Sequence, residues 1–379
     1  MAGTLAHFEV MRRYLSTYEG VTLNGDYTFK IEDLEDRIIA PEWPLFRKDV
    51  ESEWSLYRKE TEKDIYSIAI LGSTGPDLFY MPAILSKLHI FYNYSVFSDY
   101  MHYKNAGLFV KNLYETRKEE KNEKLKKNIE YLCKGFLSHM ATDLVYHPFV
   151  NSFVGKYKEH IITEVDVPGA SFLVDGNFAA HNMIEMAQDY YILTELWKGT
   201  DLNIGHNMIL TNRIKDHIPS LARSLFTAIE NTYDVKSDFI SIQNYLTYFV
   251  ANAQGSTFEE YPDTVLDDKF NYQPAIEHIM GGASIEFFLE KSMELTKLMI
   301  DKMIEGDWED ILKPWNLDTG LYTEAKVEEN EIKINFKNYD SVWNVPTPKS
   351  KEEKEAEDIA LEMYSHSPDT YKDTGIETI

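Results

Sequence analysis

Apolar residues recur at helical spacing along most of the chain. The earliest stripe, Phe8, Met11, Tyr14 and Leu15, predicts a first helix. The same pattern predicts further helices at 96–113, 125–146, 179–196, 207–233, 238–254 and 284–305, and residues 65–71 form a buried apolar run that ends in a turn cluster. We therefore predict an all-α protein whose residues 1–315 form one multi-helix bundle.

Three segments depart from this pattern. Residues 24–63 are rich in acidic and aromatic side chains, including Trp43 and Trp54, which indicates an insert in the bundle. Residues 325–336 alternate polar and apolar positions about Glu328–Asn330, which predicts a β-hairpin inside an appendage at 316–346. Residues 347–379 are Lys/Glu-rich and then polar, so we expect a solvated acidic and polar tail.

Composition narrows the function classes. The chain has 38 Lys and Arg against 63 Asp and Glu, a formal net charge of −25, which counts against nucleic-acid binding and against docking on anionic lipid. Its start has no signal-peptide pattern and no apolar run reaches membrane-spanning length, so we expect a cytoplasmic protein, with a removed leader left open. Cys133 is the only cysteine, so any metal must be held by histidines and carboxylates.

The most informative motif lies at residues 135–150. It places His139, Asp143 and His147 four residues apart in series, on one face of a predicted helix. Because Pro148 disfavours a helical conformation in the residue before it, we expect the helix to end or bend at His147.

A second pair of the same spacing follows, His181 and Glu185. Two such pairs on facing helices are a common way for a bundle to build a metal site. A single pair is more often a surface ion pair or a capped core histidine. Here the neighbouring residues are apolar, and burying these groups without partners would cost several kcal/mol. Asp189, four residues after Glu185, fits either a hydrogen-bond acceptor for a ligand histidine or a carboxylate on the helix surface.

With these motifs the chain resembles the zinc-dependent phospholipase C family, which shares its fold with the secreted P1-type nucleases. The resemblance runs roughly over residues 6–196. It implies an all-helical domain that holds three zinc ions at the base of a cleft. The residues that match the family's ligand pattern are His7, Asp77 in Gly75–Asp77, His102, His139, Asp143, His147, His181 and Glu185.

The resemblance also implies how the ligands are shared, so that we expect two or three Zn²⁺ ions. One zinc takes Asp77, His102, His139 and Asp143. A second takes His147, His181 and Glu185. A third takes His7 and shares Asp143 as a bridge.

Two positions depart from the family pattern. Secreted members use an N-terminal tryptophan at the third zinc, and this chain begins Met1-Ala2. We expect that site to be weaker or completed by water or another residue, the amine of Ala2 being one candidate. The fourth histidine is either His102 or His89, and the aromatic residues around His102 favour it.

The function that follows is hydrolysis of a phosphoester, with metal-activated water attacking a phosphodiester of a lipid or a small molecule. The family analogy makes Asp77 the carboxylate that orients or deprotonates the water, although ligation alone is an equal reading. The alternatives are a P1-type nuclease or nucleotidase and a non-catalytic zinc-binding protein. The sequence leaves the exact substrate and the oligomeric state open.

Overall fold

The computed structural model describes the helical core of the chain and several short segments. The described residues are 4–20, 64–79, 95–157, 164–167, 170–173, 185, 188–189, 191–192, 196–197, 211–233, 239–255, 285–317, 321–322, 331–336 and 339–344. The expected insert at 24–63 and the tail at 347–379 lie outside these residues, as do Trp43 and Trp54.

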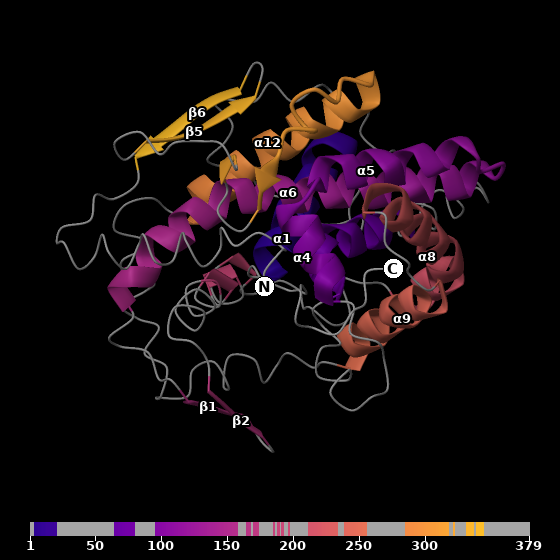
Figure 1. The fold of residues 1–379 in the computed structure, drawn as a ribbon, viewed down its shortest axis with the longest axis horizontal. Helices are drawn as coiled ribbons and strands as arrows, with labels where there is room; N and C mark the ends of the chain where they lie inside the picture. The colour runs from indigo at the N-terminus through magenta and orange to yellow at the C-terminus, as the bar shows by residue number, and fades with distance from the viewer. Residues whose placement is uncertain are drawn as a thin grey trace, which may run out of the picture.

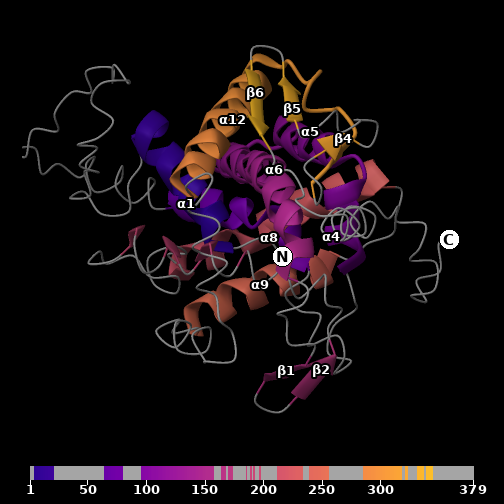
Figure 2. The same ribbon diagram turned by 90° about the vertical axis from the view of Figure 1, so that its left-hand side faces the viewer.

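A long helix, α6 (Glu123–Tyr157), runs through the middle of the fold in both ribbon views (Figures 1 and 2). Helices α1 (Thr4–Tyr14), α5 (Ala106–Glu115) and α12 (Ile285–Glu305) pack directly against it. The apolar residues of α6, among them Leu132, Phe136 and Leu144, are almost fully buried. These residues place α6 at the centre of the hydrophobic core.

Two glycines let the helix at 64–73 lie against α6. A Cβ atom on Gly72 would lie 2.4 Å from the carbonyl oxygen of Leu132, and one on Gly135 would lie 2.3 Å from that of Ala69. The two backbones can meet only because neither residue has a side chain. This contact brings the 3-10 helix that follows, η2 (Gly75–Phe79), next to the middle of α6.

The region predicted as one helix at 96–113 is two helices, α4 (Ser95–Tyr103) and α5. Asn105 separates them in the left-handed conformation, with φ of 58°. Asparagine is among the few side chains that tolerate this conformation, so the break follows from a local preference that the apolar periodicity does not reveal.

The first alternative, that α6 ends at His147, is wrong, since the helix continues through Pro148 to Tyr157, and the alternative of a bend there stays a prediction. Proline removes one main-chain hydrogen bond, and the helical turns on both sides of it remain in place. His147 therefore stays on the same helix face as Asp143.

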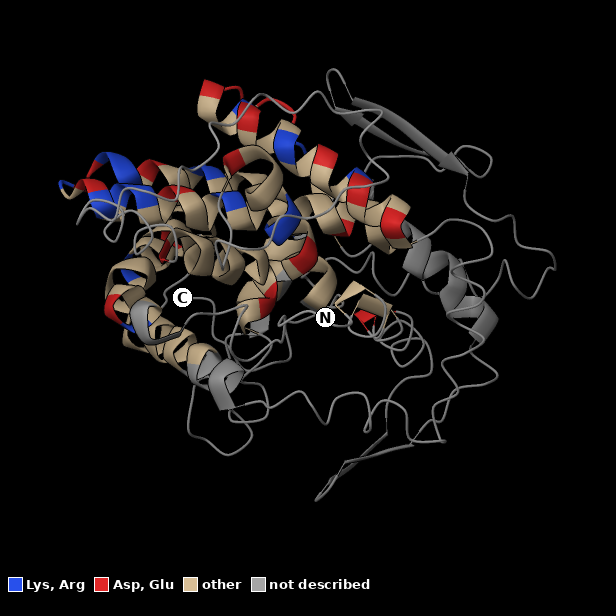
Figure 3. Cartoon of the chain, turned by 180° about the vertical axis from the view of Figure 1, so that it is seen from behind, with Lys and Arg blue, Asp and Glu red and all other residues tan. Residues whose placement is uncertain are grey.

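Helices α8 (Thr211–Tyr233) and α9 (Phe239–Gly255) pack on each other, and α8 also packs on α5. Figure 3 shows acidic and basic residues along the length of α12 and at the end of the fold where α5 is followed by α6. Among the described residues, no helix is long and apolar enough to cross a membrane.

The described strands form small antiparallel pairs: β1 (Glu164–Val167) with β2 (Ala170–Leu173), β3 (Trp315–Asn316) with β4 (Leu321–Tyr322), and β5 (Glu331–Phe336) with β6 (Tyr339–Asn344). The chain is thus mainly helical. The hairpin near the C-terminus differs from the predicted one, because Glu331–Phe336 pairs with the residues that follow it and Phe336 faces Tyr339. The alternating pattern marked a strand correctly but not the turn that closes it.

Candidate metal centre

Asp143, in the middle of α6, lies at the centre of a cluster of histidines. The Nε2 atoms of His139 and His102 lie 2.9 and 3.8 Å from its Oδ2. Those of His7 and His147 lie 3.2 and 3.6 Å from its Oδ1. All five side chains are buried. One carboxylate thus faces four imidazoles from α1, α4 and α6.

Three of these histidines turn the same ring atom toward the cluster. The Nδ1 of His139 lies 3.0 Å from the carbonyl oxygen of Ser73, and that of His102 lies 2.8 Å from the carbonyl oxygen of Ser98. The Nδ1 of His147 contacts the carbonyl oxygen of Leu317. A carbonyl can only accept, so each Nδ1 carries the proton and donates it. With the proton on Nδ1, Nε2 is the ring atom through which a neutral imidazole would ligate a metal.

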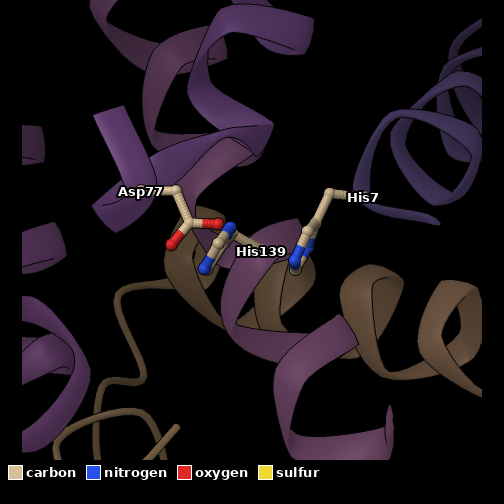
Figure 4. Close-up of side chains that lie close together, drawn as sticks. All are labelled: His7, Asp77 and His139. Carbon is tan, nitrogen blue, oxygen red and sulfur yellow. The ribbon is translucent and has the colours of Figure 1, made fainter. Parts of the chain in front are cut away.

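Asp77 and His7 complete one side of the cluster. Figure 4 shows His7 from α1, His139 from α6 and Asp77 from η2 pointing toward one another. One ligand atom from each of these three residues lies within 4.8 Å of the others, and the same is true of His102, His139 and Asp143. The rings of His7 and His139 are stacked with centroids 4.0 Å apart. Two overlapping groups of buried ligand atoms could therefore each hold a metal ion.

Several of these atoms have no hydrogen-bond partner within the described part of the chain. They are Nδ1 and Nε2 of His7, Oδ1 of Asp77, Nε2 of His139 and both carboxylate oxygens of Asp143. These unpartnered nitrogen and oxygen atoms lie close to one another in the cluster. Leaving so many buried polar atoms unsatisfied would be costly. Nitrogen and carboxylate oxygen suit zinc, so the residues present fit this ion.

Electrostatics in the cluster favour a bound cation. Burial opposes the negative charge of Asp143, but His139, His147 and His7 outweigh it and hold the pKa of this carboxyl well below its usual range. Burial likewise opposes the charge of Asp77, and the neighbouring His102 and His139 lower its pKa overall. Burial and the neighbouring His139 lower the pKa of His7, which favours the neutral ring. Burial opposes the protonated form of His147, but Asp143 and Glu185 outweigh burial and raise its pKa, so a bound cation would have to displace a proton there.

The last described member of the predicted ligand set, Glu185, joins the cluster through His147. Its Oε1 lies 3.2 Å from the Nε2 of His147, and its side chain is 2% exposed. Asp189, one turn further, is buried and accepts a hydrogen bond of 3.1 Å from the backbone N–H of Leu5. Asp189 thus contacts the first turn of α1 and does not lie on the surface. Within the described residues, no hydrogen bond to a candidate ligand histidine is seen.

A buried carboxylate on α1 fixes the orientation of that helix. Glu9 is fully buried and accepts hydrogen bonds from Arg12 and Arg13 and, at 2.9 Å, from the indole Nε1 of Trp197. Arg13 also pairs with Glu286 of α12 at 2.7 Å. His7, two residues before Glu9, therefore lies on a helix whose orientation is fixed by contacts with Trp197 and with Glu286 of α12.

The structure places His7, Asp77, His102, His139, Asp143, His147 and Glu185 close together, and their role as metal ligands stays a prediction. His181 and the competing His89 lie outside the described residues. Sequence reasoning missed the carbonyls of Ser73, Ser98 and Leu317. Ser98 lies one helical turn before His102, a spacing that could have marked it, but no signal marks Leu317.

Comparison with known protein families identifies one match. Residues 55–234 match the family described as zinc dependent phospholipase C. Over these residues, slightly less than half of the chain, the sequence is similar to the zinc dependent phospholipase C family. The match covers Asp77, His102, the α6 ligands and Glu185, and it extends further toward the C-terminus than the resemblance read from the motifs. His7 precedes it. Searches of curated proteins and of solved structures found no significant match.

Proposed function

We propose that this chain is a zinc-dependent phosphoester hydrolase that cleaves a phosphodiester of a lipid or a small molecule. Zinc dependent phospholipases C are hydrolases, and the family match covers the central helix of the cluster. The observation that carries the proposal is the convergence of unpartnered, buried nitrogen and carboxylate oxygen atoms around Asp143. Such atoms are the ligands that a catalytic zinc centre needs.

The proposed ligand sets follow the family pattern. Asp77, His102, His139 and Asp143 would hold one ion, and His147 and Glu185 would hold a second together with His181. His7 and the shared Asp143 belong to a third set, and the stacking of His7 on His139 supports its place beside the first. When bound, zinc lowers the pKa of water to near 7 and neutralises charge on phosphoryl oxygens.

The chain's own residues orient these ligands and the attacking water. The carbonyls of Ser73 and Ser98 hold the ring protons of His139 and His102 on Nδ1, so both rings present Nε2. Asp77 is the carboxylate that we assign to the attacking water. Its Oδ1, 3.4 Å from Nε2 of His102, is among the atoms without a hydrogen-bond partner in the described part of the chain.

The proposed substrate is a small or lipid phosphodiester rather than a long polynucleotide. The family implies a phosphoester substrate. A formal net charge of −25 disfavours the approach of a polyanion, whereas a single phosphate responds mainly to the local charge of the ions.

The test compares hydrolysis by the wild type with that by His139→Ala and Asp143→Asn. The substrates are a chromogenic phosphodiester, phosphatidylcholine in mixed micelles and single-stranded DNA. We expect zinc-dependent hydrolysis of one of the first two, reduced more than about 100-fold in both variants.

The matched control is His217→Ala. His217 is also a buried histidine near a carboxylate, 3.5 Å from Asp64, but it lies outside the cluster. It should keep the wild-type rate. Preferential cleavage of DNA would favour the nuclease alternative, and zinc binding without hydrolysis of any substrate would favour a non-catalytic protein.

A further inference from the structure

The segment that follows α12 returns to the metal cluster from outside the family match. It comprises residues 307–317, whereas the match ends at residue 234. Its last residue, Leu317, is completely buried. None of the residues in this segment contributes a side chain to the ligand sets, so its contact with the cluster is made by the main chain.

Leu317 makes two main-chain hydrogen bonds, each to a different histidine of the cluster. Its N–H donates to the carbonyl oxygen of His102 at 2.9 Å. Its own carbonyl oxygen accepts the Nδ1 proton of His147. His102 is on α4 and His147 is on α6, so one residue from the C-terminal part of the chain connects the two helices at the cluster.

The first of these bonds satisfies a helix end. His102 is the second-last residue of α4, where carbonyl groups have no partner within the helix. The second bond fixes a ring, because a donated Nδ1 proton leaves Nε2 of His147 facing Asp143 and Glu185. Both bonds therefore act on the direction of a ligand histidine.

The segment is held in place by contacts that do not involve the cluster. The backbone of Ile311 lies so close to α5 that a Cβ atom on Gly107 would be 1.8 Å from its carbonyl oxygen. Trp315 is buried and donates its indole N–H to the carbonyl oxygen of Asp310 at 3.0 Å. Asp310 in turn pairs with Lys302 of α12 at 2.9 Å. Leu317 is thus presented to the histidines from a rigid support.

We propose that Leu317 is a positioning residue of the metal centre, whose N–H and carbonyl hold the His102 helix end and the His147 ring in the geometry that binds zinc. The inference rests on the metal-binding part of the proposed function and does not depend on hydrolysis. It extends the centre to a part of the chain that the family match does not include. Hydrogen bonds of this kind typically change metal affinity 10–100-fold.

The test is a pair of substitutions at the same position. Leu317→Pro removes the donated hydrogen bond, because proline has no N–H, whereas Leu317→Ala shortens the side chain and keeps both main-chain bonds. Zinc affinity is measured by competition with a chromogenic chelator. The visible absorption spectrum of the cobalt-substituted protein reports ligand geometry. We expect Leu317→Pro to bind zinc about 10–100-fold more weakly with an altered cobalt spectrum, and Leu317→Ala to keep the wild-type spectrum.

A second pair of substitutions tests the proposal even if the Leu317→Pro variant does not fold. Gly107→Ala adds a methyl group against Ile311 and displaces the segment, leaving every ligand unchanged. Ala106→Gly at the neighbouring position weakens α5 by about 1 kcal/mol without adding an atom there. We expect weaker zinc binding and an altered cobalt spectrum only in Gly107→Ala.

Wild-type zinc affinity and cobalt spectrum in Gly107→Ala and in a folded Leu317→Pro would overturn the proposal. An equal loss in Leu317→Ala would also overturn it, since packing of the side chain would then explain the effect. If the wild type itself binds no zinc, the proposed function fails before the variants are compared. The two failures are therefore distinguishable.

Discussion

Gly75 sets the distance between two of the ligand-bearing elements. Its φ of 45° lies in the left-handed region, and an added Cβ atom would lie 2.8 Å from the Cγ of His139. The ring of His139 cannot simply move away, because its Nδ1 donates to the carbonyl of Ser73. Gly75 is therefore required both by its backbone conformation and by the space beside the ring.

Replacing this glycine separates conformational strain from damage to the site. We expect Gly75→Ala to lower the free energy of unfolding by about 1–3 kcal/mol and to weaken zinc binding, measured by urea unfolding and chelator competition. Gly306→Ala is the matched control, since Gly306 has a φ of 78° but open space where the Cβ atom would be. The control should lose stability and keep zinc affinity. Equal zinc affinity in both variants would contradict the role assigned to Gly75.

Glu9 makes the free energy of unfolding depend on pH in the acidic range. Burial opposes its charge, but Arg12 and Arg13 outweigh burial and lower the pKa of Glu9 from 4.5 to about 2. Because the pKa of Glu9 is lower in the folded protein than in the unfolded chain, Glu9 stabilises the fold fully at pH values above its pKa in the unfolded chain. This stabilisation is lost as the pH falls through its pKa in the folded protein. The contribution is roughly 3 kcal/mol at neutral pH.

We therefore expect Glu9→Gln to be less stable than the wild type by roughly 3 kcal/mol at pH 7, since two arginines lose their carboxylate. The difference should shrink as the pH falls from about 4.5 to about 2. Urea unfolding at a series of pH values, with a chelator present so that metal release does not contribute, measures it. A difference that stays constant with pH would show that the charge of Glu9 is not its source.

At the scale of single residues, the sequence predicted which side chains lie together better than it predicted the groups that orient them. The spacing of His139, Asp143 and His147 was sufficient because a regular helix converts spacing directly into direction. Leu317 could not be predicted, because its carbonyl acts through the main chain and carries no side-chain signature. The role of Asp189 could not be predicted, because helical spacing does not show which element its side chain faces.

At the scale of elements, α1 is positioned by the region that carries Glu185. Asp189 accepts the N–H of Leu5 in the first turn of α1, where backbone donors have no partner within the helix. His7 lies two residues further along the same turn. The orientation of His7 toward Asp143 thus depends on a carboxylate about 180 residues away in sequence.

Asp189→Ala should lower the free energy of unfolding by about 0.5–2 kcal/mol, the usual effect of losing a side chain that accepts from a helix N-terminus. We also expect faster amide hydrogen exchange in the first turn of α1. Asp189→Asn keeps an acceptor oxygen and should lose less. Unchanged exchange at Leu5 in the alanine variant would show that this hydrogen bond does not hold the helix.

Among the elements, apolar periodicity located the helical regions but not all of their ends. It joined α4 and α5 because both contribute to one apolar stripe, and the break at Asn105 depends on backbone conformation. It also ended α6 too early, because the preference of residues before proline is weaker than the continuity of a long packed helix. The hairpin was displaced because alternation identifies a strand and not its partner.

For the whole molecule, the cluster predicts that metal and fold stabilise one another. Its ligands come from α1, η2, α4, α6 and the region of Glu185, so ion binding links elements that are distant in sequence. A ligand that binds only the folded state adds about 2.7 kcal/mol at a concentration of 100 times its Kd. We therefore expect a chelator to lower the melting temperature measured by calorimetry, and added zinc to restore it.

The single cysteine provides a second readout of the same coupling. Cys133 is fully buried on α6, and burial raises the pKa of its thiol well above the usual range, so it reacts only when the core opens. A chelator should accelerate its labelling by a thiol reagent. Equal labelling rates with and without zinc would mean that the ions do not support the core.

The most direct test of the account is the zinc content of the purified protein. Elemental analysis of the wild type should give two or three zinc ions per chain. Asp143→Asn should hold fewer, because this carboxylate faces four histidines and is proposed to bridge two ions. His217→Ala should match the wild type. A wild type that holds no zinc after zinc is supplied would contradict the metal centre and the hydrolase built on it.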